Sequence, residues 1–447
     1  MKRRSVVVST MGNFGNYEEV TYSLADFSGY REARTRFSSA ALAKMSGAEL
    51  MLVFAPISLV SKYIYSSEGG NLKEISEVIK SNAQEFLIKE SGNGINIKLV
   101  VTPIKGTFSI EPPGKGTIEI RSGSGNFYVA VYKAATEIFK EYSSCEVLVD
   151  ITHSVNYMGL DMVDATNLAL RALNGSYSTK HDFSFRVYNS DPFVKDIPSR
   201  LQLNLIRTEP IHERSHSLSK IVGDLLYNLD INYCKRALKK ANLDGDVKMD
   251  ILKKLAYSFL LGAVLFVGSY KSDIKKWAGE VWNSMEDAQI AFTTSQKPAL
   301  LNGVLDLGIE LERELPKIHA FLSSISSAEF SALDNCTEIE KLKVVSELLV
   351  EPGKTLLKNE LDALRRDITG LPDEERAEKV LLRTILKHKY PEGKSNMEKE
   401  CTLDKRNFIA HAGLEANVTW VSFRGNEVFL SYDKCLDSVA KAISTKN

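Results

Sequence analysis

Four short apolar runs in the N-terminal half of the chain constrain its fold more than any other feature of the sequence. The runs occupy 5–9, 48–55, 95–104 and 145–152. They lack the polar alternation of a strand that has one face in water. We therefore expect strands that are covered on both faces, as in parallel sheets.

Amphipathic segments typical of helices lie between and after these runs. They occupy 30–45, 71–89, 126–142 and 155–173, and 183–189 is a further candidate strand. Strands that alternate with helices favour crossover connections, which place parallel strands side by side. The sequence therefore predicts an α/β domain with a Rossmann-like parallel sheet.

Beyond Pro210 the pattern becomes helical almost throughout. Apolar residues at helical spacing occur at 218–229, 249–270 and 301–323, and a last helix is expected at 433–443. Two apolar runs flank Arg424, Gly425 and Asn426, which predicts a hairpin. The polar, charged stretch at 351–400 contains several turn sequences and is predicted to be an insertion. The C-terminal part is thus predicted to be an all-α domain.

These patterns divide the chain into three parts. We predict the α/β domain at 1–195, a linker at 196–222 and the helical domain at 223–447. The change from alternating strands and helices to helices alone near Pro210 sets these boundaries.

The composition limits the class of protein. The chain of 447 residues is 44% hydrophobic and 26% charged, as soluble globular proteins are. Lys plus Arg and Asp plus Glu both number 57, so there is no global basic field, although a local basic patch suffices for RNA. The most apolar stretch, 255–270, is shorter than the roughly 20 residues of a membrane helix, and no signal peptide is evident. We expect a cytoplasmic protein without a membrane partner.

Five cysteines are widely scattered along the chain. They are Cys145, Cys234, Cys336, Cys401 and Cys435. No CxxC pair or ligand-like spacing occurs among them, so we expect no zinc site. An odd, dispersed set fits a reducing compartment.

Two loops at the carboxyl ends of predicted strands carry an unusual density of small and polar residues. The first contains Ser9, Thr10, Met11, Gly12 and Asn13, and the second contains Thr152, His153, Ser154 and Asn156. Ligands of parallel α/β sheets bind at this edge, where glycines admit close approach and helix N-termini favour anions. Such residues are also common in ordinary turns. Because both loops fall at the same predicted edge, we favour a nucleotide-like ligand.

A third loop, formed by Gly123, Ser124 and Gly125, precedes a predicted helix. It is not a dinucleotide fingerprint, because Tyr128 stands where that motif needs a third glycine. A helix capped by Asn126 explains the loop, and its residues are still candidates for lining the ligand.

Near the C-terminus, RNFIAH places Arg406, Asn407 and His411 in a short amphipathic stretch. A histidine can take or give a proton at neutral pH, and a guanidinium can hold a phosphate and stabilise developing charge. Asn407 can orient the phosphate or the imidazole. On an ideal helix the arginine and histidine lie about 140° apart, so a shared site needs a distorted helix end, a long arginine reach or a two-fold dimer. The alternative is a solvated arginine and a capping histidine before Gly413.

The motif DITHSVNYM at 150–158, together with a first strand that ends in Ser, Thr and glycine, resembles the CARF sensor domain of CRISPR-associated accessory proteins. With the R-x4-H stretch behind it, the chain resembles the CARF–HEPN ribonucleases that accompany type III CRISPR effectors. The region 351–400 is the part least matched by this resemblance.

The resemblance implies an endoribonuclease of antiviral defence with Arg406, Asn407 and His411 as catalytic residues. It implies cyclic tetra-adenylate as the allosteric activator, bound by the predicted ligand loops, and single-stranded RNA as substrate. Cleavage would need no metal or other cofactor and would leave 2′,3′-cyclic phosphates. A homodimer would form a composite HEPN site, with a higher oligomer of dimers possible.

Two alternatives remain at this stage. A CARF-type transcriptional regulator or scaffold would bind the nucleotide without catalysis, but the basic helical segment at 233–246 resembles a solvated helix face. Alternatively, the front domain could also cleave its own cyclic ligand, with Thr152, Ser154 and the Ser9–Thr10 loop positioning a ligand 2′-hydroxyl for self-attack.

Overall fold

The computed structural model describes residues 4–443 except 27–28, 63–71, 110–116, 124, 156, 177–180, 195–199, 228–229, 295–299, 302–303, 308–310, 370, 372–375, 377–378 and 390–399. The chain forms two compact units. The first unit contains 1–173, 179–212 and 282–316, and the second contains 174–178, 213–281 and 317–447.

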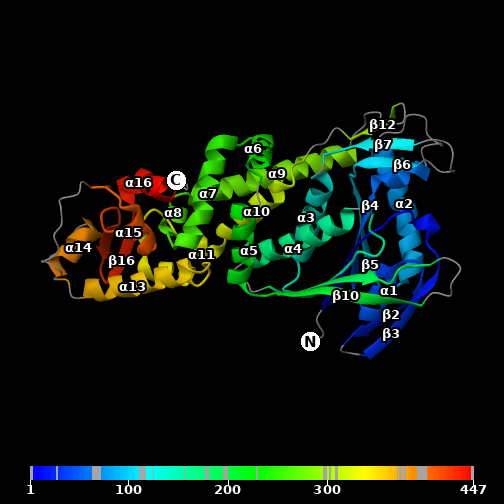
Figure 1. The fold of residues 1–447 in the computed structure, drawn as a ribbon, viewed down its shortest axis with the longest axis horizontal. Coiled ribbons are helices and arrows are strands. Elements are labelled where there is room, and N and C mark those ends of the chain that lie inside the picture. Colours follow the sequence, from blue (N-terminus) through cyan, green and yellow to red (C-terminus); the bar gives the residue numbers. More distant parts are fainter. Residues whose placement is uncertain are drawn as a thin grey trace. The chain divides into compact units, whose positions relative to one another are not determined.

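An eight-stranded sheet in the order β3-β2-β10-β9-β8-β1-β4-β5 organises the first unit (Figure 1). Its strands are β1 (Arg4–Thr10), β2 (Val20–Asp26), β3 (Gly29–Thr35), β4 (Leu50–Pro56), β5 (Asn96–Thr102), β8 (Ser144–Asp150), β9 (Asp182–Ser190) and β10 (Arg200–Ile211). The five strands from β9 to β5 are parallel, and they coincide with the five predicted strands. Val6, Val7 and Val8 are fully buried, as expected of a central strand covered on both faces.

Four helices of the first unit follow these strands. They are α1 (Ser38–Ser46), α2 (Leu72–Ser91), α3 (Asn126–Phe139) and α4 (Met158–Ser176). Three of them match predicted helices, but the helix predicted at 30–45 begins only at Ser38. Gly29–Thr35 is instead β3, which forms an antiparallel hairpin with β2. Gly29, the first residue of β3, has φ of 120°, a conformation that glycine adopts readily.

The predicted linker at 196–222 is wrong from residue 200 onward. Residues 200–211 form β10, which pairs antiparallel with β9 and parallel with β2. Leu201 and Leu203 are buried, while Gln202 between them is exposed. This alternation is the pattern of a strand with one buried face. The first helix of the second unit then begins at Arg214, also inside the predicted linker.

A second sheet of the first unit joins segments that are far apart in the sequence. Its order is β11-β12-β7-β6, with β6 (Gly106–Ser109), β7 (Thr117–Arg121), β11 (Leu300–Leu301) and β12 (Val304–Asp306). Because β12 pairs in parallel with β7, residues 282–316 belong to the first unit. The helix predicted at 301–323 therefore shrinks to α10 (Glu314–Ile325). Pairing between such distant short segments leaves no local pattern to detect.

The second unit is mostly helical and carries one small sheet. The helices not yet given are α5 (Arg214–Tyr227), α6 (Ile231–Lys240), α7 (Gly245–Leu261), α8 (Leu265–Gly268), α9 (Lys271–Thr294), α11 (Ala328–Ser331), α12 (Ile339–Ser346), α13 (Gly353–Thr369), α14 (Leu382–Lys389), α15 (Lys405–Ala410) and α16 (Leu436–Ile443). Helix α9 begins in the second unit, and its residues from 282 onward belong to the first. The sheet has the order β13-β16-β15-β14, with β13 (Thr337–Glu338), β14 (Val380–Leu381), β15 (Trp420–Arg424) and β16 (Glu427–Ser431). Strands β15 and β16 confirm the predicted hairpin. The all-α prediction for this part is therefore incomplete.

The predicted turn-rich insertion at 351–400 is also wrong over much of its length. Residues 353–369 form α13, in which Leu357, Leu361 and Leu364 are buried at helical spacing. Helix α14 follows, and the turn sequence predicted at 390–396 lies outside the described residues. Residues 353–369 are thus part of the helical core, because their leucines are buried on one face of an amphipathic helix.

Two of the five cysteines are paired. Cys401 and Cys435 form a disulfide, whereas Cys145, Cys234 and Cys336 lie outside any disulfide. The disulfide corrects the expectation of dispersed reduced cysteines, because tertiary packing brings together two residues that sequence spacing leaves unrelated. No helix among the described residues is long and apolar enough to cross a membrane.

Candidate functional site

Asp150, the last residue of β8, organises the turn that carries the DITHS motif. Its carboxylate is buried and accepts hydrogen bonds at Oδ1 from the Thr152 amide (3.0 Å) and hydroxyl (2.6 Å). At Oδ2 it accepts from the hydroxyls of Ser38 (2.5 Å) and Ser39 (2.7 Å). A buried carboxylate with this many donors fixes the turn rigidly.

The two predicted ligand loops meet at the carboxyl edge of the sheet. The Thr10 hydroxyl donates to the Ser154 hydroxyl at 2.8 Å. This contact follows from the parallel pairing of β1 with β8, in which Ser9 lies beside Asp150. Gly159 of α4 packs closely behind, where an added Cβ would lie 3.0 Å from the Cβ of Ser154. The loops therefore form one rigid surface.

His153 lies among aromatic rings. Its ring centroid is 4.1 Å from that of Tyr17, in a stacked arrangement, and 5.4 Å from that of Phe37. Its Nε2 atom lies 3.4 Å from the hydroxyl of Tyr22. Burial lowers the pKa of His153, and the charge of Asp150 opposes that shift only in part. The imidazole is accordingly neutral near pH 7 and suited to stacking and hydrogen bonding.

A cavity of about 400 Å³ opens beside this turn in the first unit. Its lining includes Asn16, Tyr17, Glu18, Val20, Tyr22, Thr152, His153, Asn189, Ser190, Asp191, Pro192, Phe193 and Leu201. Aromatic rings next to amide and hydroxyl groups are suited to a nucleobase. Only Thr152 and His153 of this lining were predicted. The walls from β2 and β9 were missed because those strands reach the cavity through tertiary packing.

The other predicted ligand residues take varied positions. Met11 is fully buried, and its amide donates to the Phe54 carbonyl (3.1 Å). Ser9 is also buried, while the Gly12 amide donates to the Tyr17 hydroxyl (2.6 Å). The Asn13 side chain accepts from the Gly15 amide (3.3 Å).

The predicted glycine loop serves packing. An added Cβ at Gly125 would lie 2.3 Å from the Leu311 carbonyl oxygen, and the Asn126 side chain accepts from the Leu311 amide at 2.7 Å. Neither Gly123 nor Gly125 lines the described cavity. Ser124 and Asn156 lie outside the described residues.

In the second unit, α15 presents the R-x4-H residues. Asp404 caps the helix, accepting from the amides of Arg406 (2.7 Å) and Asn407 (3.0 Å). Phe408 is fully buried and anchors the helix, while the side chains of Arg406 and Asn407 are exposed. The cap and the anchor hold both polar side chains at the surface.

The loop after α15 is held tightly. Ala412 and Gly413 have φ of 50° and 84°, and the Tyr432 hydroxyl donates to the Gly413 carbonyl at 3.2 Å. An added Cβ at Gly413 would lie 2.7 Å from the Cβ of Ala263. The helix therefore ends at Ala410, and this crowded turn fixes the position of His411, its C-terminal cap.

Glu360 of α13 orients His411. The Nδ1 atom of His411 lies 3.0 Å from Oε2 of Glu360. An ionised carboxylate can only accept, so the Nδ1–H donates and Nε2 remains for proton transfer. Glu360 was missed because it lies in the predicted insertion, 51 positions away. Nothing in the local sequence identifies it.

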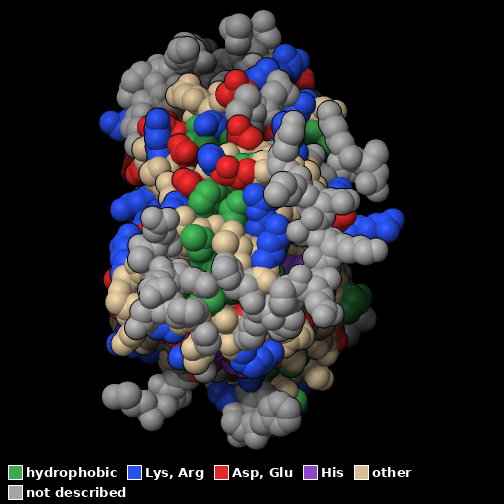
Figure 2. All heavy atoms as spheres, turned by 90° about the vertical axis from the view of Figure 1, so that its left-hand side faces the viewer, with side chains coloured by type: hydrophobic (Ala, Val, Ile, Leu, Met, Phe, Trp, Pro, Cys, Tyr) green, Lys and Arg blue, Asp and Glu red, His purple; other side chains and the backbone are tan. Residues whose placement is uncertain are grey.

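Two of the candidate catalytic residues are joined through the backbone of α15, since the His411 amide donates to the Asn407 carbonyl at 2.9 Å. Among the described residues, Arg406 and His411 share no hydrogen bond, since they occupy opposite ends of α15. No cluster of His, Cys, Asp or Glu in the described part of the chain has the arrangement of a metal site. On the side of the molecule that carries α13, α14 and α15, Lys and Arg side chains lie beside a central apolar group, with acidic side chains above (Figure 2).

Comparisons with known proteins identify a family for both parts of the chain. Residues 6–192 match the family model described as CRISPR system endoribonuclease Csx1, CARF domain, and 350–434 match the HEPN domain of the same endoribonuclease. A relative from Methanocaldococcus jannaschii, named CRISPR system endoribonuclease Csx1, is 26% identical over 428 residues, which are 93% of this chain and 86% of that protein. The HEPN match includes Glu360, Arg406 and His411, and it overturns the expectation that 351–400 is the least matched region. The chain therefore belongs to the CARF–HEPN endoribonucleases of CRISPR systems.

Proposed function

We propose that the protein is a cyclic tetra-adenylate-activated, metal-independent endoribonuclease that cleaves single-stranded RNA. The observation that carries this proposal is the Glu360–His411 hydrogen bond next to the exposed Arg406. It provides an oriented proton acceptor and a cation on one short helix, within the segment that matches the HEPN model.

The chemistry uses the RNA's own 2′-hydroxyl as nucleophile. Nε2 of His411 accepts the 2′-hydroxyl proton while the 2′-oxygen attacks the adjacent phosphorus, and Arg406 stabilises the charge on the phosphate oxygens. The bond to the 5′-oxygen breaks, and that oxygen takes up a proton. The products are a 2′,3′-cyclic phosphate and a 5′-hydroxyl, and DNA is resistant because it lacks the nucleophile.

Two protomers complete the site in this proposal. Arg406 and His411 lie at opposite ends of α15, so a two-fold pairing that brings two copies of this helix together would place an arginine near a histidine of the other copy. Asn407, on the exposed side of the helix, would orient the phosphate. Support comes from the exposure of all three side chains.

The cavity in the first unit is the proposed activator site. Its volume of about 400 Å³ and its aromatic lining fit one adenosine unit of the ring. A ring of four such units is two-fold symmetric and suits a homodimer in which each protomer supplies one set of loops. The ligand activates only if it binds the competent arrangement more tightly.

The test is cleavage of a fluorescent single-stranded RNA in EDTA, with cyclic tri-, tetra- or hexa-adenylate or without activator. We expect activity with cyclic tetra-adenylate and none in Arg406→Ala or His411→Ala. Cleavage that survives in both variants would place the active site elsewhere. Binding of one ring without cleavage by the wild type would instead support a nucleotide-binding regulator.

A further inference from the structure

Residues 311–313 pack onto the start of α3 in the first unit, although they come from the C-terminal half of the chain. The Arg313 amide nitrogen would lie 2.5 Å from a Cβ added at Gly125, so only glycine permits this approach. The bond from the Leu311 amide to Asn126 adds a specific polar contact. The segment is therefore fixed beside the carboxyl edge of the sheet.

Arg313 contacts the first turn of α4. Its Nη1 atom lies 2.7 Å from Oδ1 of Asp161, and its Nη2 atom lies 3.6 Å from Asp164. The guanidinium also stacks over the Tyr128 ring, 4.6 Å from its centroid. The Asp161 side chain is 5% exposed and that of Arg313 is 41% exposed. Loss of the arginine would leave a buried carboxylate without its cation.

The helix that Arg313 holds follows directly from the candidate ligand turn. Gly159 of α4 touches Ser154, which in turn accepts from Thr10. A change in the turn must therefore displace the start of α4 or strain this contact, because the packing leaves no space. Asp161 lies on the same first turn of the helix and would move with it.

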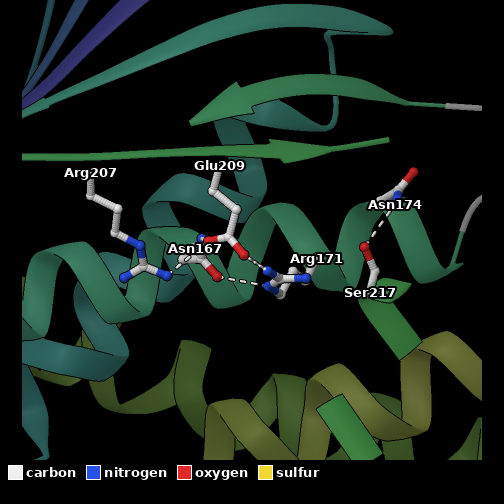
Figure 3. Close-up of polar contacts among 6 residues, drawn as sticks. All are labelled: Asn167, Arg171, Asn174, Arg207, Glu209 and Ser217. Atoms are coloured by element: carbon white, nitrogen blue, oxygen red, sulfur yellow. Dashed lines mark hydrogen bonds and ion pairs between the residues drawn. The ribbon is translucent and has the colours of Figure 1, made fainter. Parts of the chain in front are cut away.

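The remainder of α4 is bound to other elements of the fold (Figure 3). Glu209 of β10 accepts from Asn167 at 3.0 Å and pairs with Arg171 and Arg207. Near the end of α4, Asn174 donates to Ser217 of α5 at 3.0 Å. These contacts hold the later part of the helix, and its last residues, 174–176, belong to the second unit. Arg313 is a second connection, from the start of α4 to α10.

Arg313 immediately precedes α10, and the later residues of α10 belong to the second unit. There, Phe321 packs edge-on against Phe259 of α7, with ring centroids 6.0 Å apart. At the end of α7, a Cβ added at Gly262 would lie 2.9 Å from the Cβ of Ala412, the residue that follows His411. Close contacts thus run from α10 through α7 to the loop of His411, Ala412 and Gly413, called the catalytic loop below.

We propose that Arg313 is a positioning residue that couples the activator site to the catalytic loop through its ion pair with Asp161. The inference rests on the proposed function and deepens it by naming the coupling element. Arg313 touches neither the activator cavity nor the described catalytic residues. It transmits the displacement of α4 to the start of α10. The resulting coupling free energy between the activator site and the catalytic loop is observed as activation of RNA cleavage.

The experiment compares Arg313→Ala with Arg207→Ala. Arg207 is a matched control because it is also a partly exposed arginine of the first unit in an ion pair, with Glu209 at 2.8 Å, and it is not attached to α10. Three quantities are measured for the full-length protein: affinity for cyclic tetra-adenylate, RNA cleavage with and without it, and melting temperature. We expect Arg313→Ala to bind the activator within about three-fold of wild type and to lose at least about ten-fold of its activation. Arg207→Ala should keep both.

The charge-swapped double variant Asp161→Lys with Arg313→Glu tests the ion pair directly. It should recover part of the activation that each single variant loses, which a loss of folding would not allow. The inference would be overturned if Arg313→Ala were activated as strongly as the wild type. It would also be overturned if Arg313→Ala lost activator affinity by the same factor as it lost activation. Absence of activation in the wild type with every ring would overturn the proposed function and this coupling with it.

Discussion

Glu360 Oε2 accepts a hydrogen bond from His411 Nδ1 at 3.0 Å, joining the middle of α13 to the end of α15. The carboxylate fixes the orientation of the imidazole and selects the tautomer with Nε2 unprotonated. The side chain of His411 is 50% exposed and that of Glu360 is 27% exposed. The reactive nitrogen can therefore meet a substrate while its partner stays sheltered.

Substitution of Glu360 should reduce catalysis without reducing RNA binding. We expect Glu360→Ala to lower kcat by roughly 10- to 100-fold with KM little changed, because the imidazole loses its orientation. Glu360→Gln keeps an acceptor oxygen and should fall between wild type and Glu360→Ala. Steady-state cleavage of a short RNA measures both parameters.

The control for this prediction lies on the same helix. Asp362 pairs with Lys343 at 3.3 Å and is mostly exposed, so Asp362→Asn should leave kcat unchanged. Equal losses in Asp362→Asn and Glu360→Ala would mean that α13 requires its charge in general, and that Glu360 has no specific role.

Substitution of two glycines of the second unit distinguishes the energetic cost of backbone strain from the cost of steric crowding. Gly413 and Gly425 both have positive φ, at 84° and 61°. An added Cβ meets no atom within 4 Å at Gly425, but lies 2.7 Å from Ala263 and Tyr432 at Gly413. We expect Gly425→Ala to lower the free energy of unfolding by about 1 kcal/mol. Gly413→Ala should cost about 3 kcal/mol or more and displace His411.

Urea unfolding of the two variants, alongside RNA cleavage, measures this difference. Gly425→Ala should retain wild-type activity, since the hairpin turn is remote in sequence from α15 and its surroundings are open. If both variants lose the same free energy, the close packing around Gly413 has no energetic consequence.

His153 should be required for activator binding and dispensable for the nuclease chemistry. Its ring stacks on Tyr17 and lies beside Phe37, so His153→Ala removes a wall of the cavity. We expect at least about a ten-fold loss of affinity for cyclic tetra-adenylate. Cleavage without activator should be unchanged, because the catalytic residues belong to the second unit.

Equilibrium binding of a labelled ring tests this expectation, with Tyr30→Ala as the control. Tyr30 is a tyrosine of the same unit with 59% of its surface exposed and does not line the cavity. Wild-type affinity in His153→Ala would show that the activator binds elsewhere.

Local patterns were sufficient to predict the parallel sheet and the edge at which the two polar loops meet. Apolar runs without alternation specify buried parallel strands, and parallel neighbours bring their carboxyl ends to one edge. These two facts place both loops at one edge, where the hydroxyls of Thr10 and Ser154 meet in the structure. The polar face of α13, by contrast, was mistaken for an insertion because its buried leucines are separated by charged residues.

Other features depend on contacts between distant segments, which no local pattern contains. The pairing of β12 with β7 moves residues 282–316 into the first unit. Glu360 and His411 meet only after α13 and α15 have packed together. Strand propensity itself depends on such context, so β10 could not be distinguished from a linker by its sequence.

The stability of the protein should fall in mild acid because of His319 in α10. Burial lowers the pKa of this imidazole to about 4, against an ordinary value of 6.5. Below pH 6.5 the unfolded chain binds a proton that the folded chain refuses, so the free energy of unfolding decreases as pH falls. Between pH 6.5 and 4 this group should account for about 3 kcal/mol.

Unfolding by urea at pH 7.5, 6 and 5 checks this prediction for wild type, His319→Gln and His216→Gln. His319→Gln cannot take up the proton. Between pH 6.5 and 5, its free energy of unfolding should therefore decrease by about 2 kcal/mol less than that of the wild type. His216 is an exposed histidine of α5, and His216→Gln is the control for replacing a histidine outside α10. An unchanged pH dependence in His319→Gln would mean that the unfolded and folded chains bind this proton equally well, contrary to the lowered pKa of the ring.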